Sequence, residues 1–450
     1  MRKFSLFGIS IWLLMACAPA DSKVVANDFT NSVAVNDSTP LLVLRSFFNR
    51  NENVSVEEIK EGVLSGKVVC TADVAGKIQR VLHIDHAVRV MDLASFPYTD
   101  TLFYVLTTID SVRPSVLLTE VNDAHFLRDR TNYPLWIPDS VCRKWDSSIT
   151  SYTHTGVTAL TRRTGSILNT IGNEKYLELI RPALGNPDLL HVSNEVSMLD
   201  NCDYSSMKMK FATRPEHLDI VRLLGVDIVE LTGNHNLDMG EEPYEATMNW
   251  YKSQGVKTFG GGLSPQEAAA PLVLSLKDGK KVAWIGFNEF CPCGECADQN
   301  MGANRYKEEK AKSSIAELRN EVDYIIACVQ FGETDSYVPS SSQMKISKYL
   351  IDAGADVVIG SQAHQPQTFE YYHGKMIFYG IGNFMFDQIH RLGVRQAYYL
   401  ECFFYNGKII QFIPHFTYMG DDRRPAPANR EQADAIRKEV YLPNYFLGKY

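Results

Sequence analysis

The sequence predicts an α/β protein in which buried strands alternate with amphipathic helices. Between residues 189 and 361, short runs of apolar β-forming residues alternate with longer segments of helical periodicity. Pro215 stands where the first turn of a helix tolerates proline, and Gly225 and Gly354 follow the ends of two predicted helices. Strands that are almost continuously apolar and alternate with helices are typical of sheets covered by helices.

The predicted elements follow one another in a regular order along this part of the chain. Strands are predicted at residues 189–193, 226–232, 281–287, 322–331 and 355–361. Helices are predicted between them, at residues 215–224, 242–253, 307–321 and 341–353. Residues 375–387 and 398–416 are predicted to form further strands, and Asn406-Gly407 is a hairpin signal within the second of these segments.

The length of 450 residues favours two domains. We predict a small N-terminal α/β domain at residues 41–147 and a larger domain at residues 148–450. In the small domain, Ser55 and Glu58 are spaced as a capping box at the start of a helix. This helix and the Gly66-Lys67 after it resemble a segment of periplasmic solute-binding proteins, which implies a solute receptor as one alternative function.

The first 40 residues predict export and a lipid anchor. Two early cations precede an apolar run at residues 4–16 that is too short to span a bilayer, as in a secretory signal. Its Leu-x-Ala-Cys ending resembles a bacterial lipobox, which implies cleavage before Cys17 and attachment of lipid to its sulfur. Residues 18–40 would then be a flexible tether to the bacterial cell envelope. The alternative is an ordinary signal peptide with a chance cysteine.

Charge and cysteine content limit the function further. The net charge is −8 and there is no basic block, so nucleic acid is not expected as a partner. Export permits disulfides, which are expected around Cys291, Cys293 and Cys296, with a zinc site as the alternative. Cys328 lies inside an apolar run and is expected to be a buried free thiol.

Polar residues gather directly after the predicted strands. Because the carboxyl ends of parallel strands meet at one edge of a sheet, these clusters are expected to form one site. They occupy residues 156–162, 193–197, 233–238, 330–335, 360–367 and 382–388.

These clusters, in this order, resemble the CapA family of poly-gamma-glutamate capsule synthesis proteins, built on the calcineurin-like metallophosphatase fold. The resemblance covers residues 149–387 and includes the Gly-rich stretch at residues 259–271. It implies a four-layer α-β-β-α sandwich: two sheets face to face, helices outside, and a site at one sheet edge. The implied partner is an anionic or peptide polymer of the envelope.

The resemblance also implies roles for individual residues. Asn234, His364 and Glu333 would bind metal, His235 would steady or protonate a leaving group, and Glu195 would act as a base or further ligand. The other polar residues of the strand ends are expected to bind substrate: Thr158, Arg162, Asn194, Asn236, Asp238, Gln330 and Gln362.

Three positions depart from the pattern of the family. Thr158 stands where the family has an early aspartate, and Gln330 and Gln362 stand where it has histidines. Neutral groups supply too little charge for a two-metal centre, so we expect at most one divalent metal ion, Zn²⁺ or Mn²⁺. Two functions stay open: a CapA-type envelope lipoprotein that assists polymer synthesis or handling, and an active metal-dependent hydrolase acting on a phosphoester or amide.

Overall fold

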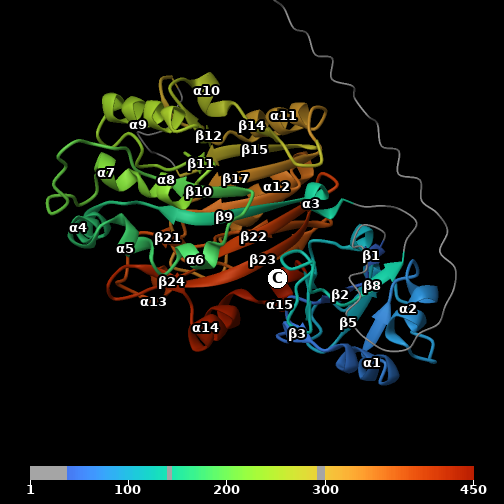
Figure 1. Cartoon of the computed structure of the whole chain (residues 1–450). Coiled ribbons are helices and arrows are strands. Elements are labelled where there is room, and N and C mark those ends of the chain that lie inside the picture. Colours follow the sequence, from blue (N-terminus) through green and yellow to red (C-terminus); the bar gives the residue numbers. More distant parts are fainter. Residues whose placement is uncertain (1–37, 139–143, 291–298, 450) are drawn as a thin grey trace, which may run out of the picture. The chain divides into compact units, whose positions relative to one another are not determined.

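The computed structural model describes residues 38–138, 144–290 and 299–449, and two sheets dominate these residues (Figure 1). The first sheet is mixed and has eight strands. Seven are hydrogen-bonded in the order β12 (Lys257–Phe259), β11 (Ile228–Glu230), β10 (Leu189–Asn194), β9 (Ile149–Thr158), β22 (Gln396–Tyr405), β23 (Lys408–Met419) and β24 (Pro425–Pro427), and β21 (Asn383–Met385) also pairs with β9.

The second sheet has six strands. Their order is β14 (Leu272–Ser275), β15 (Lys281–Asn288), β17 (Tyr324–Gln330), β18 (Val357–Ser361), β20 (Lys375–Phe378) and β19 (Phe369–Tyr372). The four central strands are mutually parallel, and β14 and β19 are antiparallel edge strands. In the first sheet, β9 to β12 are parallel as well.

Successive side chains of a strand point to opposite faces of its sheet, so the apolar residues form three hydrophobic layers: one between the sheets and one on each outer face. In β17, Ile326 and Cys328 belong to the core shared by the two sheets. Ile325 and Ala327 face the other way and pack with Ile315 and other residues of the outer helices. A third cluster covers the outer face of the eight-stranded sheet. The order of layers is helix, sheet, sheet and helix, which confirms the predicted sandwich.

Helices cover both outer faces. The eight-stranded sheet is covered by α4 (Arg162–Ile171), α5 (Asn173–Leu177), α6 (Arg181–Leu184), α7 (Pro215–Leu218), α8 (Ile220–Leu224) and α9 (Glu241–Ser253), and the six-stranded sheet by α11 (Glu308–Leu318) and α12 (Ser341–Ala353). The predicted single helix at residues 215–224 is instead two short helices. Asp219 interrupts it, because its ψ of −12° departs from the α-helical value.

The N-terminal residues form sheets of their own. A four-stranded sheet has the order β4 (Val68–Cys70), β5 (Tyr104–Thr107), β2 (Leu42–Arg45) and β6 (Leu117–Leu118), and two pairs join β1 (Ser38–Pro40) to β8 (Trp136–Pro138) and β3 (Asn53–Val54) to β7 (Glu120–Val121). The predicted capping box is present at the start of α1 (Val56–Leu64). Helices α2 (Ala75–Leu82) and α3 (Trp145–Ser148) complete the segment, and the division of the chain at residue 147 stays a prediction.

The N-terminal segment is tied to the sandwich by buried contacts. Phe47 and Leu117 belong to the core between the two sheets. The Gln411 side chain of β23 accepts from the Leu118 amide at 2.7 Å and donates to the Val116 carbonyl at 2.8 Å. All described residues accordingly belong to one compact unit.

One further helix is α14 (Arg430–Val440). The other strands and α-helices are short: β13 (Gly261–Gly262), β16 (Gly302–Ala303), α10 (Pro265–Ala269), α13 (Leu392–Arg395) and α15 (Pro443–Phe446). At the predicted hairpin between β22 and β23, Asn406 and Gly407 both have positive φ, as this turn type requires.

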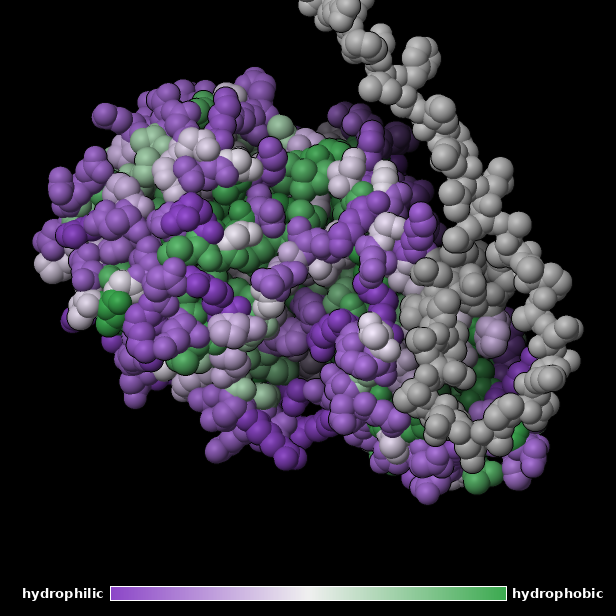
Figure 2. Space-filling model, in the orientation of Figure 1, coloured by the Kyte–Doolittle hydropathy of each residue, from purple (hydrophilic) through white to green (hydrophobic). Residues whose placement is uncertain are grey.

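Figure 2 shows hydrophilic residues over most of one face of the molecule, with apolar residues between them. Within the described ranges, no helix has the length and apolar character needed to cross a membrane. Cys328 is a buried free thiol, as predicted. Cys17 and the cysteines at residues 291, 293 and 296 lie outside the described residues, so their predicted lipidation and disulfides stay predictions.

Candidate functional site

The strand ends bring a group of polar side chains together around the amide of Gln330, the last residue of β17. Its Nε2 donates to Glu195 Oε1 at 3.0 Å and to Asn234 Oδ1 at 2.8 Å, and it also contacts Gln362 Oε1. These residues follow β10, β11 and β18. All four side chains are buried. Four of the predicted site residues therefore share one position at the edge of the sandwich.

Several polar atoms of this group have no hydrogen-bond partner among the described residues. They are Thr158 Oγ1, Glu195 Oε2, Gln330 Oε1 and Gln362 Nε2. A buried polar atom without a partner is costly, and native proteins rarely keep several of them at one place. The cluster is therefore suited to a polar ligand, an ion or ordered water.

Glu195 is the buried carboxylate of the cluster. Burial raises the pKa of Glu195, while the nearby His364 and His235 lower it and the Glu333 and Glu230 carboxylates raise it further. These side chains consequently lie within electrostatic range of one another. A carboxyl group with a raised pKa can exchange a proton closer to neutral pH, as the predicted role of a base requires.

His235 is held by Asp238. The Nδ1 atom lies 2.7 Å from Asp238 Oδ2, and that carboxylate also accepts from the Phe211 amide at 2.6 Å. A proton on Nδ1 leaves the lone pair of the imidazole on Nε2. Asp238 therefore orients the predicted catalytic histidine, a role more specific than the binding role predicted for it.

His364 is held in the same way by Asn383, on β21. Its Nδ1 lies 2.9 Å from Asn383 Oδ1, so Nδ1 donates to this oxygen and the ring is oriented with Nε2 toward Glu333. Nε2 lies 3.8 Å from Glu333 Oε1, and the imidazole lowers the pKa of the Glu333 carboxyl. Asn383 lies in the strand-end cluster at residues 382–388, but the sequence alone did not single it out as the residue that orients His364.

Arg162 supplies positive charge beside the two histidines. Its guanidinium pairs with Asp387 and lies over the rings of Phe211 and Phe386, 4.6 and 4.9 Å from their centroids. His235 lies 4.0 Å from the Phe211 ring, and His364 lies 5.4 Å from the Phe386 ring. The two phenylalanines, which the sequence analysis missed, therefore connect Arg162 to both histidines.

Two predicted binding residues point elsewhere. Asn194 donates to Tyr251 Oη at 2.8 Å and to the Val196 carbonyl, on the side of the outer helices. Asn236 donates to the Gly233 and Leu231 carbonyls and so braces its own loop. These hydrogen bonds are structural, and a binding role for Asn194 and Asn236 stays a prediction.

The backbone of the site is tight and strained. Gln362 and His364 have φ values of 74° and 54°, a region that residues other than glycine seldom adopt and that is enriched at functional sites. Gly233 approaches Glu195 so closely that an added Cβ would lie 2.9 Å from the Glu195 Cα and Cγ atoms. Only glycine lets the Asn234 loop lie against this carboxylate without displacement.

The residues at the strand ends offer donor atoms for a single metal ion. His364 Nε2 lies 3.8 Å from Glu333 Oε1, and a cation would fit between them at about 2.0–2.2 Å from each atom once the imidazole is neutral. Asn234 and Glu195 offer further oxygens. When bound, a divalent ion would lower the pKa of a water molecule. Its identity, and its presence, stay predictions.

A different group lies inside the sandwich. His154, Glu230 and Cys328 place ligand atoms within 4.8 Å of one another, a spacing that could hold a metal ion. Glu195, Glu333 and His364, although described, do not form so tight a group.

Burial favours the neutral form of each member of this interior group. Burial raises the pKa of Glu230 and Cys328 and lowers that of His154, so a metal ion would have to displace protons. Thr232 donates to Glu230, and Tyr152 Oη lies 2.7 Å from His154 Nδ1. With these contacts the group is equally consistent with a buried hydrogen-bond network that holds no metal ion.

Comparison with known proteins places the chain among capsule synthesis proteins. Residues 151–388 match the family described as "Bacterial capsule synthesis protein PGA_cap". The chain is 24% identical over 220 residues to "PGA biosynthesis protein CapA" of Bacillus subtilis (strain 168), covering 48% of this chain and 58% of that protein. It is 25% identical over 236 residues to "Capsule biosynthesis protein CapA" of Bacillus anthracis, covering 50% and 57%.

A relative of lower sequence identity is also named for the synthesis of a polymer. Over 221 residues the chain is 20% identical to "Probable polyglutamine synthesis accessory protein MT0602" of Mycobacterium tuberculosis (strain CDC 1551 / Oshkosh), covering 44% of this chain and 56% of that protein. The chain thus spans just over half the length of these three relatives. Because the family match covers more than half of its 450 residues, the chain belongs to the bacterial capsule synthesis protein family PGA_cap.

Proposed function

We propose that this protein is an envelope lipoprotein that binds an acidic, glutamate-type polymer at the strand-end cleft during capsule synthesis or handling. The observation that carries the proposal is the convergence of Glu195, Asn234, Gln330 and Gln362, with unpartnered buried polar atoms among them. Arg162, which pairs with Asp387 and lies over the Phe211 ring beside His235, is the guanidinium group that a polymer carboxylate would approach. The names of the two Bacillus relatives, a PGA biosynthesis protein and a capsule biosynthesis protein, support a capsule polymer as the ligand.

Binding of a fluorescent γ-linked oligoglutamate to the full chain tests this proposal by anisotropy. The wild type should bind, and added salt should weaken binding because ion pairs contribute. Arg162→Ala should weaken binding at least tenfold. Arg163→Ala is the matched control, because Arg163 is the next residue and its side chain is exposed. Equal affinities of wild type and Arg162→Ala would contradict the proposal.

The lipid anchor is part of the proposal and has its own test. Labelled palmitate fed to expressing cells should enter the wild-type protein and not a Cys17→Ser variant. The motivation is the lipobox-like ending of residues 14–17 and the polar segment after it. Equal labelling of both proteins would contradict lipid attachment at Cys17 and with it the proposed membrane anchor.

A metal-dependent hydrolase is the second candidate, favoured by the orientation of His364 Nε2 toward Glu333. Metal content is measured after dialysis against Zn²⁺ and Mn²⁺. A cleft site predicts that His364→Ala abolishes binding, Cys328→Ser leaves it unchanged, and His235→Ala keeps the metal but removes turnover. Loss of metal in Cys328→Ser alone would place the ion at the interior group. A metal-free wild type would exclude this candidate and leave polymer binding.

A further inference from the structure

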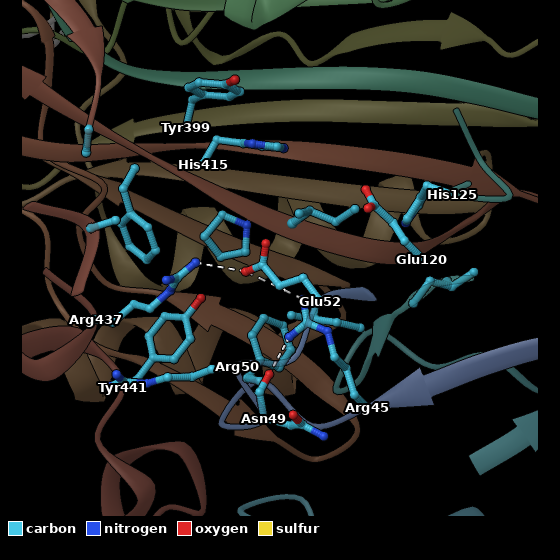
Figure 3. A pocket seen from close by; sticks show the side chains of 18 of the residues that line it. Arg45, Asn49, Arg50, Glu52, Glu120, His125, Tyr399, His415, Arg437 and Tyr441 are labelled. Carbon is cyan, nitrogen blue, oxygen red and sulfur yellow. Dashed lines mark hydrogen bonds and ion pairs between the residues drawn. The ribbon is translucent and has the colours of Figure 1, made fainter. Parts of the chain in front are cut away.

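A pocket lined by none of the strand-end residues lies between the N-terminal segment and the C-terminal strands (Figure 3). It has a volume of about 330 Å³, within the range of small-ligand sites. Its walls come from β2, β6 and the loops after them, and from β22, β23 and α14. Apart from Ala183, every lining residue lies outside residues 151–388, the segment that matches the family.

Four arginines and two glutamates line this arginine pocket, in a chain whose net charge is −8. The arginines are Arg45, Arg50, Arg128 and Arg437, and the glutamates are Glu52 and Glu120. Carboxylates behind the wall hold two of these arginines: Glu401 pairs with Arg128, and Asp434 lies 3.4 Å from Arg437. Such fixed guanidinium groups are suited to binding a carboxylate through two parallel hydrogen bonds.

Arg45 is the residue whose surroundings most clearly call for a ligand. It is 6% exposed, and burial lowers its pKa. Nη1 donates to the Asn49 carbonyl at 2.7 Å, but Nε has no partner among the described residues, and the nearest carboxylate oxygen, of Glu52, is 3.9 Å away. A buried charge compensated so weakly is costly unless an anion approaches it.

Glu52 occupies the position that a ligand carboxylate would take. Figure 3 shows it between Arg437 and Arg45, and its Oε1 atom lies 2.8 Å from Arg437 Nη2. The Glu52 side chain is 58% exposed, so displacing it from an ion pair this open to water costs little. The two guanidinium groups are therefore already spaced to share one carboxylate.

Neutral and apolar groups complete the pocket. His125 is 5% exposed, burial lowers its pKa to about 3, and neither ring nitrogen has a hydrogen-bond partner within the described part of the chain. It can therefore donate and accept as a neutral imidazole. Phe47, Leu117 and Phe416 offer apolar surface for the methylene groups of a ligand.

We propose that the arginine pocket binds the carboxylate end of an acidic ligand, with one or two linked glutamyl residues seated in the pocket, by displacing Glu52 from Arg45 and Arg437. A carboxylate is favoured over phosphate, because Glu52 and Glu120 would repel a doubly charged anion more strongly. That the pocket takes a carboxylate is independent of the proposed function. That the natural ligand is a glutamyl group rests on it.

Calorimetric titration of the full chain with glutarate tests the carboxylate site without reference to the capsule polymer. Arg437→Gln should weaken glutarate binding at least tenfold, and Glu52→Gln should strengthen it several-fold by removing the internal competitor. A purely structural role for these residues would not produce that gain. Arg424→Ala is the matched control, since Arg424 is similarly exposed (19% against 23%) and does not line the pocket. Absence of saturable binding, or no gain in Glu52→Gln, would overturn the proposal.

Titration with γ-linked triglutamate separates this site from the strand-end cleft. If triglutamate binding is weakened by Arg437→Gln in an Arg162→Ala background, the glutamyl assignment is supported. If glutarate binds and triglutamate does not, the carboxylate site stands and the glutamyl assignment fails. If triglutamate binding depends on Arg162 alone, the cleft keeps its proposed function and the arginine pocket is excluded as a polymer site.

Discussion

At the scale of single residues, the site depends on close approaches that the strand ends make possible. Gly233 and Gly156 are the clearest cases, because an added Cβ on Gly156 would lie 2.0 Å from the Gly382 carbonyl oxygen. The first contact packs the loop after β11 against Glu195, and the second packs β9 against the residue that precedes β21. The polar atoms around Gln330 are held in place as a result.

Gly233→Ala should disturb the cluster at its centre. The new Cβ would lie 2.9 Å from Glu195 Cα, and relieving that overlap should lower the free energy of unfolding by about 1–3 kcal/mol. Polymer binding should weaken in parallel. Gly76→Ala in α2 is the control: no atom lies within 4 Å of its added Cβ, and helix propensity predicts a gain of up to about 1 kcal/mol. Urea unfolding measures both, and equal stability of wild type and Gly233→Ala would contradict the geometry.

The positions of most site residues follow from the sequence, and their partners do not. Glu195, Asn234, Gln330 and Gln362 meet because each follows a parallel strand, a rule that needs only the strand pattern. The sequence presents Gln330 as a lost histidine ligand. Only tertiary packing shows that its amide joins three of the strand-end side chains.

At the scale of elements, the capped helices and the strands of the two main sheets were predictable, and the pairing of the N-terminal strands was not. The helix predicted at residues 341–353 is α12, with a capping box at Ser340 and Gln343. The N-terminal strands have two to four residues, too few to show periodicity, and their pairing is set by contacts distant in sequence. The edge strands β14 and β19 run antiparallel to the central strands, a direction that strand patterns do not encode.

Gln411 should be a principal link between β23 and the N-terminal sheet. Gln411→Leu keeps the size of the side chain but leaves the Leu118 amide and the Val116 carbonyl without this partner. Each buried unsatisfied group costs about 1–3 kcal/mol. Thermal unfolding of Gln411→Leu should have a lower midpoint than that of the wild type. In a separate hydrogen-exchange measurement, the Leu118 amide should exchange faster. Unchanged exchange at Leu118 would show that the link does not hold this edge.

At the scale of the whole molecule, burial lowers the pKa of several described histidines, and for three of them the shift is large. Burial lowers the pKa of His125 and His191 to about 3 and that of His154 well below its usual value. The unfolded chain binds protons on these groups below about pH 6.5, whereas the folded chain does not. Stability should therefore be fully present above pH 6.5 and should fall as the pH drops toward 3.

Because the unfolded chain takes up a proton at each of these histidines, each should lower the free energy of unfolding by about 2 kcal/mol between pH 7 and pH 5. His125→Gln should accordingly flatten the dependence of the free energy of unfolding on pH, measured by urea unfolding at several pH values. His373→Gln is the control, because His373 is 68% exposed. An equal pH slope in wild type and His125→Gln would contradict the assignment of a neutral buried imidazole.

The arginine pocket also exists only at this scale. Glu52 and Arg437 are 385 residues apart in sequence and meet because the N-terminal segment packs on the C-terminal strands. Local patterns contain no signal for such a pair. The fold class and the strand-end site were therefore accessible from sequence, and the second pocket required the assembled chain.

The central claim is that the strand-end cleft binds an acidic glutamate-type polymer through Arg162 and the groups around Gln330. A crystal structure of the full chain grown with γ-linked oligoglutamate tests it most directly. Electron density for a ligand carboxylate is expected within hydrogen-bond distance of the Arg162 guanidinium, beside His235 and His364. Ligand density found only away from this cleft, with the groups around Gln330 unchanged, would contradict it.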